Sequence, residues 1–356
     1  MSKSLASVLG LLWIAGACAC GLGTPDGQEG GRCIHQGGIL DGSSTCNGDL
    51  LCSYDDVCEK EHFAPGEVIL ASGQRPGPVA ADGTNVYWAS DKVNLCGTDG
   101  SGLTTLATGQ YIAEAIAVDA TNVYFTDGPS VMKCAIGGCG GNPTTLATDQ
   151  LPGAIAADAT NVYWTDRNDG TVMKCAIGGC GGKPTILASE QWDATGIAVD
   201  ATSVYWVNND AATVSHVGDG TVMKCSVDGC GGVPTILASG QSTPSYLAVN
   251  ATSVFWTANG AVMACAVGGC GGIPTTLAQM HSYPNGLAAD ATAVYWTERP
   301  QFHLDGKVMK CAAGGCGGNP TVLTSGQFAP AGIAVDATSV YWSGGRGGSV
   351  RKLTPK

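Results

Sequence analysis

Charged side chains are scarce in this sequence: they make up 13% of its 356 residues, and 17 Lys and Arg stand against 29 Asp and Glu. The formal net charge of −12 argues against a nucleic-acid partner, because phosphate backbones bind to basic surfaces. A helical period of apolar residues is also missing. The sequence therefore does not favour a helical fold.

Long apolar runs are missing too, and the one near the start of the chain, residues 5–17, has 13 residues. It is too short to span a bilayer, but with Lys3 before it the pattern is typical of an export signal. The run AGAC at 15–18 resembles a bacterial lipobox, in which Cys18 carries the lipid. The usual Leu three residues before the Cys is absent, so simple secretion is the alternative. We assign residues 1–20 to the signal peptide and lipobox, and the Gly-rich residues 21–32 to a flexible tether.

Catalytic signatures are absent as well: there is no GxSxG, no HExxH, no P-loop and no complete EF-hand loop. The side chains that could supply acid–base chemistry or hold a cation are His216, His281, His303, Glu190 and Glu298. Nothing in the sequence fixes the distances between them. We therefore expect no catalysis, no cofactor and no metal. A lyase or hydrolase with a cation-assisted site is the alternative.

What the chain has in abundance is glycine, with 54 residues, and an internal repeat. The triplet VYW or a close variant recurs at intervals of 37 to 50 residues, centred on Tyr87, Tyr124, Tyr163, Tyr205, Phe255, Tyr295 and Tyr341. Each unit holds four short runs rich in β-branched and aromatic residues, which predict antiparallel strands A to D. In the third copy the runs are GAIAAD, NVYWT, GTVMKCA and PTILAS. Repeated four-stranded units of this length predict the blades of a β-propeller.

The two ends of the repeat region predict how the ring closes. The seventh copy stops after strand C, whereas an unpaired strand D, EVILASGQ at 67–74, precedes the first copy. Pairing residues 67–72 with residues 349–353 would complete the last blade and leave no open edge between blades. The predicted fold class is therefore all-β, a seven-bladed propeller over residues 63–356. Six blades with a spare unit is the rival count.

A small cysteine-rich segment, residues 33–62, precedes the propeller. Its four cysteines are Cys33, Cys46, Cys52 and Cys58. In an exported protein they favour two disulfides, with three possible connectivities. A zinc site is the less favoured alternative, because no CxxC spacing is present.

Five blades carry the spacing C-x4-C, from the end of strand C into the Gly-rich C–D loop. The pairs are Cys134/Cys139, Cys175/Cys180, Cys225/Cys230, Cys265/Cys270 and Cys311/Cys316. In an oxidising compartment each pair is expected to close a local disulfide that staples this loop, and metal binding is the alternative. Cys96 has no second cysteine in its loop, so it is either free or bonded to Cys20.

Two other residue types recur once per blade. An aromatic residue on strand B is expected to pack between blades; the seven are Trp88, Phe125, Trp164, Trp206, Trp256, Trp296 and Trp342. A carboxylate stands at the A–B turn of six blades, where it is expected to cap turn amides rather than to bind metal. These are Asp82, Asp119, Asp158, Asp200, Asp290 and Asp336, with Asn250 in the fifth copy.

The loops divide into two classes. A–B turns and C–D loops are near copies of each other, whereas B–C and D–A loops, which share the opposite face, diverge. Divergent loops on a rigid scaffold are where function usually lies. Aromatic residues outside the blade pattern gather on this face: Trp192, Tyr111, Tyr246, Tyr283 and Phe328. With His281, His303 and Glu298 they are the candidate binding residues, and filling the gaps between loops is their alternative role.

The run YWTD at 163–166, with near matches at 124–127 and 295–298, carries a resemblance to known families. From about residue 64 the chain resembles the YWTD propellers of LDL-receptor-type proteins and the related NHL class. It is most similar to uncharacterised bacterial, myxobacterial-type surface lipoproteins with IAVDATxVYWT repeats. The streptogramin lyases are a weaker analogue. LDL-receptor propellers have six blades, so the count differs here, and no binding residue carries over.

The resemblance implies extracellular recognition. We expect a binding or scaffold protein at the bacterial cell surface, in the outer membrane as a lipoprotein, or in the periplasm. A protein or a glycan is the expected ligand of a monomer that touches the membrane only through its lipid anchor.

Overall fold

The computed structural model describes residues 63–110, 113–209, 220–279, 283–299, 306–344 and 348–356, and the backbone of five short strands before them. The chain divides into two compact units, Met1–Glu61 and His62–Lys356. No helix occurs among the described residues, and accordingly none there is long and apolar enough to cross a membrane.

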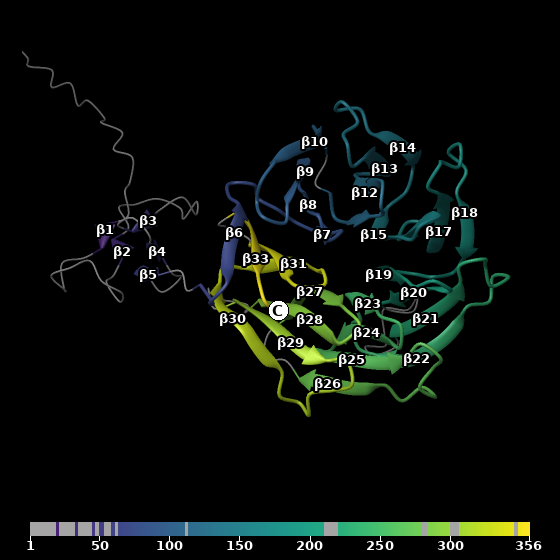
Figure 1. Ribbon diagram of the computed structural model, residues 1–356. Helices are drawn as coiled ribbons and strands as arrows, with labels where there is room; N and C mark the ends of the chain where they lie inside the picture. The colour runs from purple at the N-terminus through teal and green to yellow at the C-terminus, as the bar shows by residue number, and fades with distance from the viewer. Residues whose placement is uncertain are drawn as a thin grey trace, which may run out of the picture. The chain divides into compact units, whose positions relative to one another are not determined.

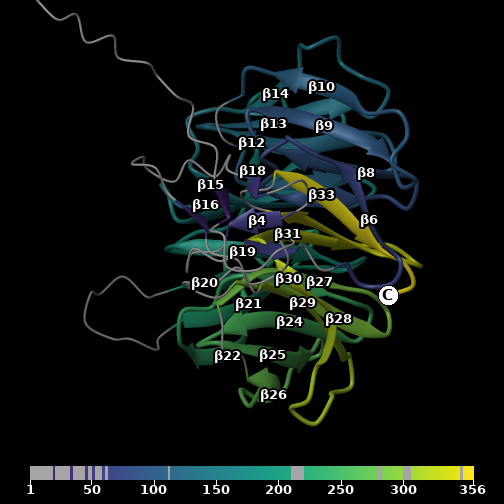
Figure 2. The same cartoon turned by 90° about the vertical axis from the view of Figure 1, so that its left-hand side faces the viewer.

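The second unit is a ring of seven four-stranded antiparallel sheets (Figure 1). In blades one to six each sheet is one sequence repeat, and its strands follow chain order from the inner strand A to the outer strand D. The inner strands β7, β15, β19, β23, β27 and β31 surround the axis, and β10, β14, β18, β22, β26 and β30 lie outside (Figure 1). Figure 2 shows the same ring from its rim.

The strand bounds follow the repeat closely. Blade one has β7 (Val79–Ala81), β8 (Asn85–Ala89), β9 (Lys92–Gly97) and β10 (Thr104–Thr108). Blade two has β11 (Ile116–Val118), β12 (Asn122–Asp127), β13 (Ser130–Ala135) and β14 (Thr144–Ala147). Blade three has β15 (Pro152–Ala157), β16 (Asn161–Asp166), β17 (Thr171–Ala176) and β18 (Thr185–Ala188). Blade four has β19 (Ala194–Val199), β20 (Ser203–Asn208), β21 (Gly220–Ser226) and β22 (Thr235–Gln241). Blade five has β23 (Leu247–Val249), β24 (Ser253–Ala258), β25 (Ala261–Ala266) and β26 (Thr275–Gln279). Blade six has β27 (Tyr283–Ala289), β28 (Ala293–Arg299), β29 (Gly306–Ala312) and β30 (Thr321–Gln327).

Blade seven closes the ring as predicted. It combines β31 (Pro330–Val335), β32 (Val340–Gly344) and β33 (Ser349–Leu353) with β6 (Glu67–Ala71) from the start of the propeller. β6 lies antiparallel to β33, with Glu67 opposite Leu353 and Ala71 opposite Val350 (Figure 1). The count of seven blades is confirmed, and the rival count of six is wrong.

The core lies between neighbouring blades rather than within any single blade. The strand-B aromatic of each blade is fully buried, from Trp88 to Trp342, and so is the residue before it. Between blades three and four, for example, Tyr163 and Leu187 pack with Trp206, Met223 and Cys225. A two-sided blade has no other place to bury these rings, so the predicted packing role of the strand-B aromatics is confirmed.

The five predicted loop disulfides are formed, each with Cα atoms 5.4 to 5.5 Å apart. The bonds join Cys134 to Cys139, Cys175 to Cys180, Cys225 to Cys230, Cys265 to Cys270 and Cys311 to Cys316. Sulfur atoms bonded to each other are not thiolate ligands, so the alternative of metal binding by these pairs is wrong.

The two cysteines of a pair differ in their surroundings. The first lies on strand C and is 1 to 3% exposed in every pair. The second is only half-buried in the C–D loop; these residues are Cys139, Cys180, Cys230, Cys270 and Cys316.

The second cysteine also makes a contact outside its own loop, which the sequence did not predict. Its Sγ lies 3.5 to 3.8 Å from a leucine carbonyl oxygen on strand D of the preceding blade. The contacts are Cys139 with Leu106, Cys180 with Leu146, Cys230 with Leu187, Cys270 with Leu237 and Cys316 with Leu277. The reason is that strand C packs at the blade boundary, so the loop that leaves it passes along the neighbouring strand D.

Cys96 is free and fully buried, so the alternative bond to Cys20 is wrong. Burial raises the pKa of the Cys96 thiol to about 11, with a smaller contribution from Asp99. Among the described residues no cluster of three or more His, Cys, Asp or Glu could hold a metal ion.

The first unit contains β1 (Ala19–Cys20), β2 (Cys33–Ile34), β3 (Thr45–Cys46), β4 (Leu50–Cys52) and β5 (Cys58–Lys60). β1 pairs with β2, and β3, β4 and β5 form a small sheet in which Cys52 lies opposite Cys58. The side chains of this unit and Cys18 lie outside the described residues. Its disulfide connectivity therefore stays a prediction.

Candidate functional site

The variable face, formed by the B–C and D–A loops, is built on a glutamine that recurs at the start of each described D–A link. Its side chain donates to the carbonyl oxygen two residues earlier in six links. In four blades its Oε1 also accepts the strand-B Trp N–H of the next blade, over 2.9 to 3.2 Å. The buried tryptophan therefore fixes the backbone of the link above it.

The residue before this glutamine has a left-handed backbone in every one of the six links. It is Gly in four of them, whereas Asp149 and Glu190 adopt φ of 60° and 59°. The residue after the glutamine then follows a sharp turn on the variable face. The equivalent described residues there are Arg75, Leu151, Trp192, Ser242 and Phe328. Trp192 and Phe328 were predicted one by one from the sequence, without the structural position that they share.

Trp192 is the best-defined of the candidate binding residues. Its side chain is 46% exposed although the residue lies in an ordered link between blades three and four. A Cβ atom at Gly170 would lie 2.9 Å from the Cε3 atom of the indole, so only glycine lets the ring lie against this backbone. The amide of Gln191 donates to the Gly170 carbonyl oxygen over 2.7 Å and holds the two segments together.

Two asparagines at the end of strand B in blade four hydrogen-bond to the residues on either side of Trp192. Asn208 donates through Nδ2 to Gln191 Oε1 over 2.9 Å, and the amide of Asn209 donates to the Asp193 carbonyl oxygen over 3.1 Å. Asp166, which is 1% exposed, accepts the amides of Leu151 and Asn168 through Oδ1 alone. We call this region, residues 151, 166–170, 190–193 and 208–209, the blade 3–4 seam.

Some buried polar atoms at the seam have no hydrogen-bond partner within the described part of the chain. Four enclosed atoms there have no partner among the described residues: Asp166 Oδ2, Arg167 Nε, Asn208 Oδ1 and Asn209 Oδ1. Three of them are acceptors. Buried polar atoms of folded proteins are nearly always satisfied, by protein groups or by ordered water. The seam therefore favours solvent or ligand groups that donate hydrogen bonds.

The other predicted site residues do not join Trp192 at the seam. Tyr246 is half-buried and donates to Asn285 Oδ1 over 3.0 Å between blades five and six, and burial raises its pKa. Phe328 is half-buried in the link to blade seven. Tyr283 begins β27, but its side chain lies outside the described part. Tyr111, His216, His281 and His303 also lie outside the described residues.

Glu298 has a structural partner instead of a catalytic one. It is 8% exposed, and its Oε1 accepts the Trp296 N–H over 2.9 Å. This is the bond that glutamine makes in other blades. The proposed acid–base role of Glu298 gains no support from its surroundings.

The repeat face, formed by A–B turns and C–D loops, carries the recurring carboxylates. Each of the six Asp residues accepts turn amides through Oδ1, so their capping role is confirmed; for Asp158 the amides are those of Thr160 and Asn161. Oδ2 accepts the strand-B Tyr hydroxyl over 2.6 to 2.9 Å in all six blades. This tyrosine bond was not predicted from the sequence, although the fixed five-residue spacing from Asp to Tyr was visible.

The Asp–Tyr pairs change the acidity of both partners. Burial alone would raise the pKa of Asp158, but hydrogen bonds from Tyr163 and the turn amides outweigh it, and the pKa lies below its ordinary value. Burial, with the neighbouring carboxylate, raises the pKa of Tyr163 above its ordinary value. The same directions hold in the five other blades. At neutral pH the carboxylates are thus charged, and their oxygens accept hydrogen bonds from the tyrosine and the turn amides.

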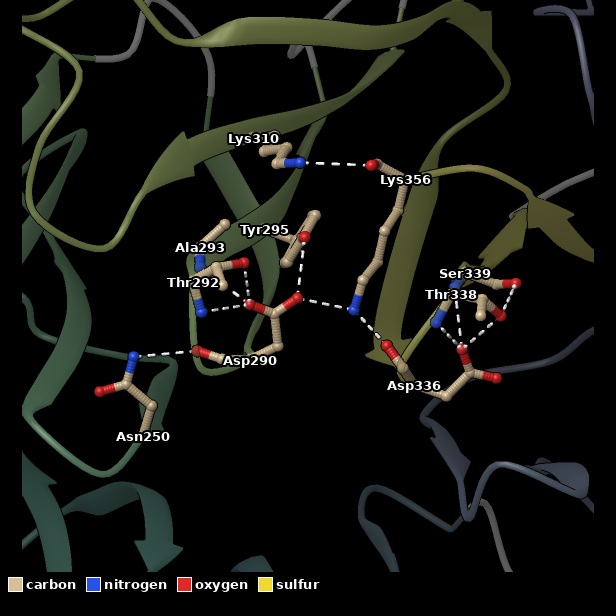
Figure 3. A network of polar contacts seen from close by, with 10 residues as sticks. All are labelled: Asn250, Asp290, Thr292, Ala293, Tyr295, Lys310, Asp336, Thr338, Ser339 and Lys356. Atoms are coloured by element: carbon tan, nitrogen blue, oxygen red, sulfur yellow. Dashed lines mark hydrogen bonds and ion pairs between the residues drawn. The ribbon is translucent and has the colours of Figure 1, made fainter.

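The last residue of the chain reinforces this face at blades six and seven. Lys356 Nζ lies 2.6 Å from Asp290 Oδ2 and also donates to the Asp336 carbonyl oxygen (Figure 3). Lys310 Nζ reaches the Lys356 oxygen over 3.2 Å. The repeat face is therefore occupied by internal contacts, and the variable face is the better candidate for a ligand site.

No family model matches the chain, and no curated protein matches it in sequence. Solved propellers match it in structure. The nidogen/laminin complex has a TM-score of 0.51 at 18% identity, over 64% of this chain and 88% of that chain. A streptogramin B lyase has a TM-score of 0.62 at 11% identity, over 84% and 97%. Virginiamycin B lyase from Staphylococcus aureus has a TM-score of 0.61 at 13% identity, over 81% and 98%.

At these identities the similarity shows the fold alone. The resemblance to propellers is confirmed at that level, and the match to nidogen agrees with the YWTD motif. Kinship with the bacterial surface lipoproteins stays a prediction. Because binding proteins and lyases both share the fold, the fold does not choose between them.

Proposed function

We propose that this chain is an exported, lipid-anchored envelope protein that binds a protein or glycan ligand on its variable face. The observation that carries the proposal is Trp192, an exposed indole held in place by Gly170 and Gln191. Rigid, exposed aromatic rings are common anchors for sugar rings and for partner proteins. The acceptor-rich seam beside the ring suits a ligand that donates hydrogen bonds.

Export and lipid anchoring rest on separate support. Five closed disulfides favour an oxidising compartment outside the cytoplasm. The lipobox-like run before Cys18 supplies the anchor. Feeding a labelled fatty acid to a bacterial host should label the full chain but not a Cys18→Ser variant. Equal labelling of both would contradict anchoring at Cys18.

Ligand binding is tested by thermal shift with soluble cell-wall fragments and a panel of oligosaccharides. A binding probe should raise the melting temperature of the full chain and of Ser242→Ala, but not of Trp192→Ala. Ser242 occupies the position of Trp192 in the link to blade five, so it is a matched control. The same shift in all three proteins would contradict a site at the blade 3–4 seam.

A further inference from the structure

One sector of the propeller contains no charged residue. Residues 229–289 include no Asp, Glu, Lys or Arg, although the whole chain carries a net charge of −12. This stretch, which we call the neutral sector, covers β22 of blade four, all of blade five and β27 of blade six. Figures 1 and 2 both show β22, β25 and β26 in the lower part of the view.

In blade five, three residues that form a polar and charged group in blade three are all replaced by uncharged residues. Where blade three has Asp158, Tyr163 and Lys174, blade five has Asn250, Phe255 and Ala264. In blade three Lys174 Nζ donates to the Val227 carbonyl oxygen of the next blade over 2.6 Å. Strand-C lysines make the same kind of contact in four other blades.

Folding does not require these replacements, but it accommodates them. Asn250 Oδ1 still accepts the amides of Thr252 and Ser253, and its Nδ2 donates to the Asp290 carbonyl oxygen over 2.9 Å (Figure 3). Phe255 is fully buried and has no hydroxyl that would need a carboxylate. The buried and turn positions of blade five are therefore satisfied as in its neighbours. Packing within the blade does not explain why its charged residues are missing.

The surface of the neutral sector is apolar at positions that are polar elsewhere. The residue before the proline of the C–D loop is Asn142, Lys183 or Asn319 in blades two, three and six. In blades four and five it is Val233 and Ile273, which are 77% and 81% exposed. Ile236 on β22 adds a third apolar side chain, 59% exposed, although Ile186 at the same position of blade three is exposed to the same extent.

We propose that the neutral sector is the surface on which a second copy of this chain docks. Two molecules of net charge −12 repel each other. The repulsion is weakest when they meet through the neutral sectors, because these carry no charged residue. Burying Val233, Ile236 and Ile273 supplies the attraction. This proposal departs from the monomer expected from sequence.

The repulsion between two acidic molecules predicts how salt should affect the dimer. Adding NaCl screens the repulsion between the two acidic bodies and leaves apolar contacts intact, so the dimer should become tighter. An interface held by ion pairs would become weaker under the same change. Self-association of the full chain is measured by analytical ultracentrifugation at about 20 mM and about 500 mM NaCl.

Substitutions locate the surface. Val233→Asp and Ile273→Asp should each raise the dimer dissociation constant by about tenfold or more, because they bury a charge without a partner. Asn142→Asp and Asn319→Asp add the same charge at the same loop position of blades two and six, and should leave the dissociation constant nearly unchanged. All four positions are exposed, so melting temperatures should match the parent and exclude misfolding.

Three results would overturn the proposal. The full chain could remain a monomer at high protein and salt concentrations. The dimer could tolerate Val233→Asp and Ile273→Asp as well as the two control variants. A monomer could bind neutral phosphatidylcholine vesicles through Val233 and Ile273, which would assign the sector to a lipid surface instead.

Discussion

At the scale of single residues, the fold depends on a contact repeated around the ring: the A–B turn carboxylate that caps amides and accepts a tyrosine hydroxyl. Asp158 uses both of its oxygens in this way, with Tyr163 at 2.7 Å. Blade five shows that the pair changes together, since Asn250 is combined with Phe255. The two residues therefore act as one unit.

A double-mutant cycle tests this coupling. Tyr163→Phe and Asp158→Asn should each lower the free energy of unfolding by about 1–3 kcal/mol, because each leaves a polar partner poorly satisfied. The double variant copies blade five and should lose less than the sum of the two. Chemical denaturation measures all four proteins. Strict additivity would contradict the coupling.

The same carboxylates predict how stability depends on pH. All six have pKa values below the ordinary 3.8 in the folded protein, whereas in the unfolded chain they return to it. Their contribution is therefore complete above about pH 4 and is lost as the pH falls through the folded values. The melting temperature should drop steeply between about pH 4 and pH 2, and less steeply in the Asp158→Asn/Tyr163→Phe variant. A melting temperature that stays constant over this range would contradict the prediction.

At the scale of the element, the C–D loop is rich in glycine in the five blades that carry the C-x4-C spacing. The loop disulfide compensates for this in five blades. Its second sulfur also packs against the preceding blade: Cys180 Sγ lies 3.8 Å from the Leu146 carbonyl oxygen. The disulfide thus orders a loop and supports a blade boundary.

Removing one disulfide should have a moderate effect. For so short a loop the chain-entropy model gives about 2 kcal/mol, so Cys175→Ser/Cys180→Ser should fold but melt several degrees lower. Calorimetry measures the change. A reductant should lower the melting temperature of the parent further than that of the variant, which has one disulfide fewer to lose. If the variant melts at the parent temperature, the loop disulfide contributes no stability.

At the scale of the whole molecule, the ring closes through a buried ion pair between distant parts of the chain. Glu67 and Arg351 lie 3.0 Å apart with side chains 0% and 4% exposed. Burial lowers the pKa of Arg351 to about 10, which leaves it charged at neutral pH. Glu67 also accepts the Thr324 hydroxyl over 2.7 Å, and so joins blade seven to blade six.

Breaking this pair should open the ring more readily than any surface change. Arg351→Met leaves the Glu67 carboxylate buried without its cation and should cost about 3–5 kcal/mol. Glu67→Gln/Arg351→Met removes both charges and should regain part of the loss. The pair Arg167–Glu114, whose side chains are 32% and 61% exposed, is the control, since Arg167→Met should cost no more than about 1 kcal/mol. Equal losses at the two sites would contradict a special role in closure.

Much of the fold could be predicted because the same strand and turn pattern occurs in seven copies. Strand order, the packing role of Trp164 and the five loop disulfides follow from patterns within about 50 residues, and the closing strand at 67–71 follows from comparing the two ends of the repeat region. The candidate site could be predicted only as a face and a set of aromatics. Trp192 stood out, but its support by Gly170 and the unused acceptors of Asp166 and Asn208 depend on which loops meet in space.

The sequence by itself determined the architecture of the propeller, because alternating β-branched and aromatic residues repeat with a turn residue between every two strands. Tertiary structure alone decided which side chains are already engaged. Tyr246 pairs with Asn285, 39 residues away, and Glu67 pairs with Arg351, 284 residues away. Such contacts have no local signal, because closing the ring places neighbours together whatever their separation along the chain.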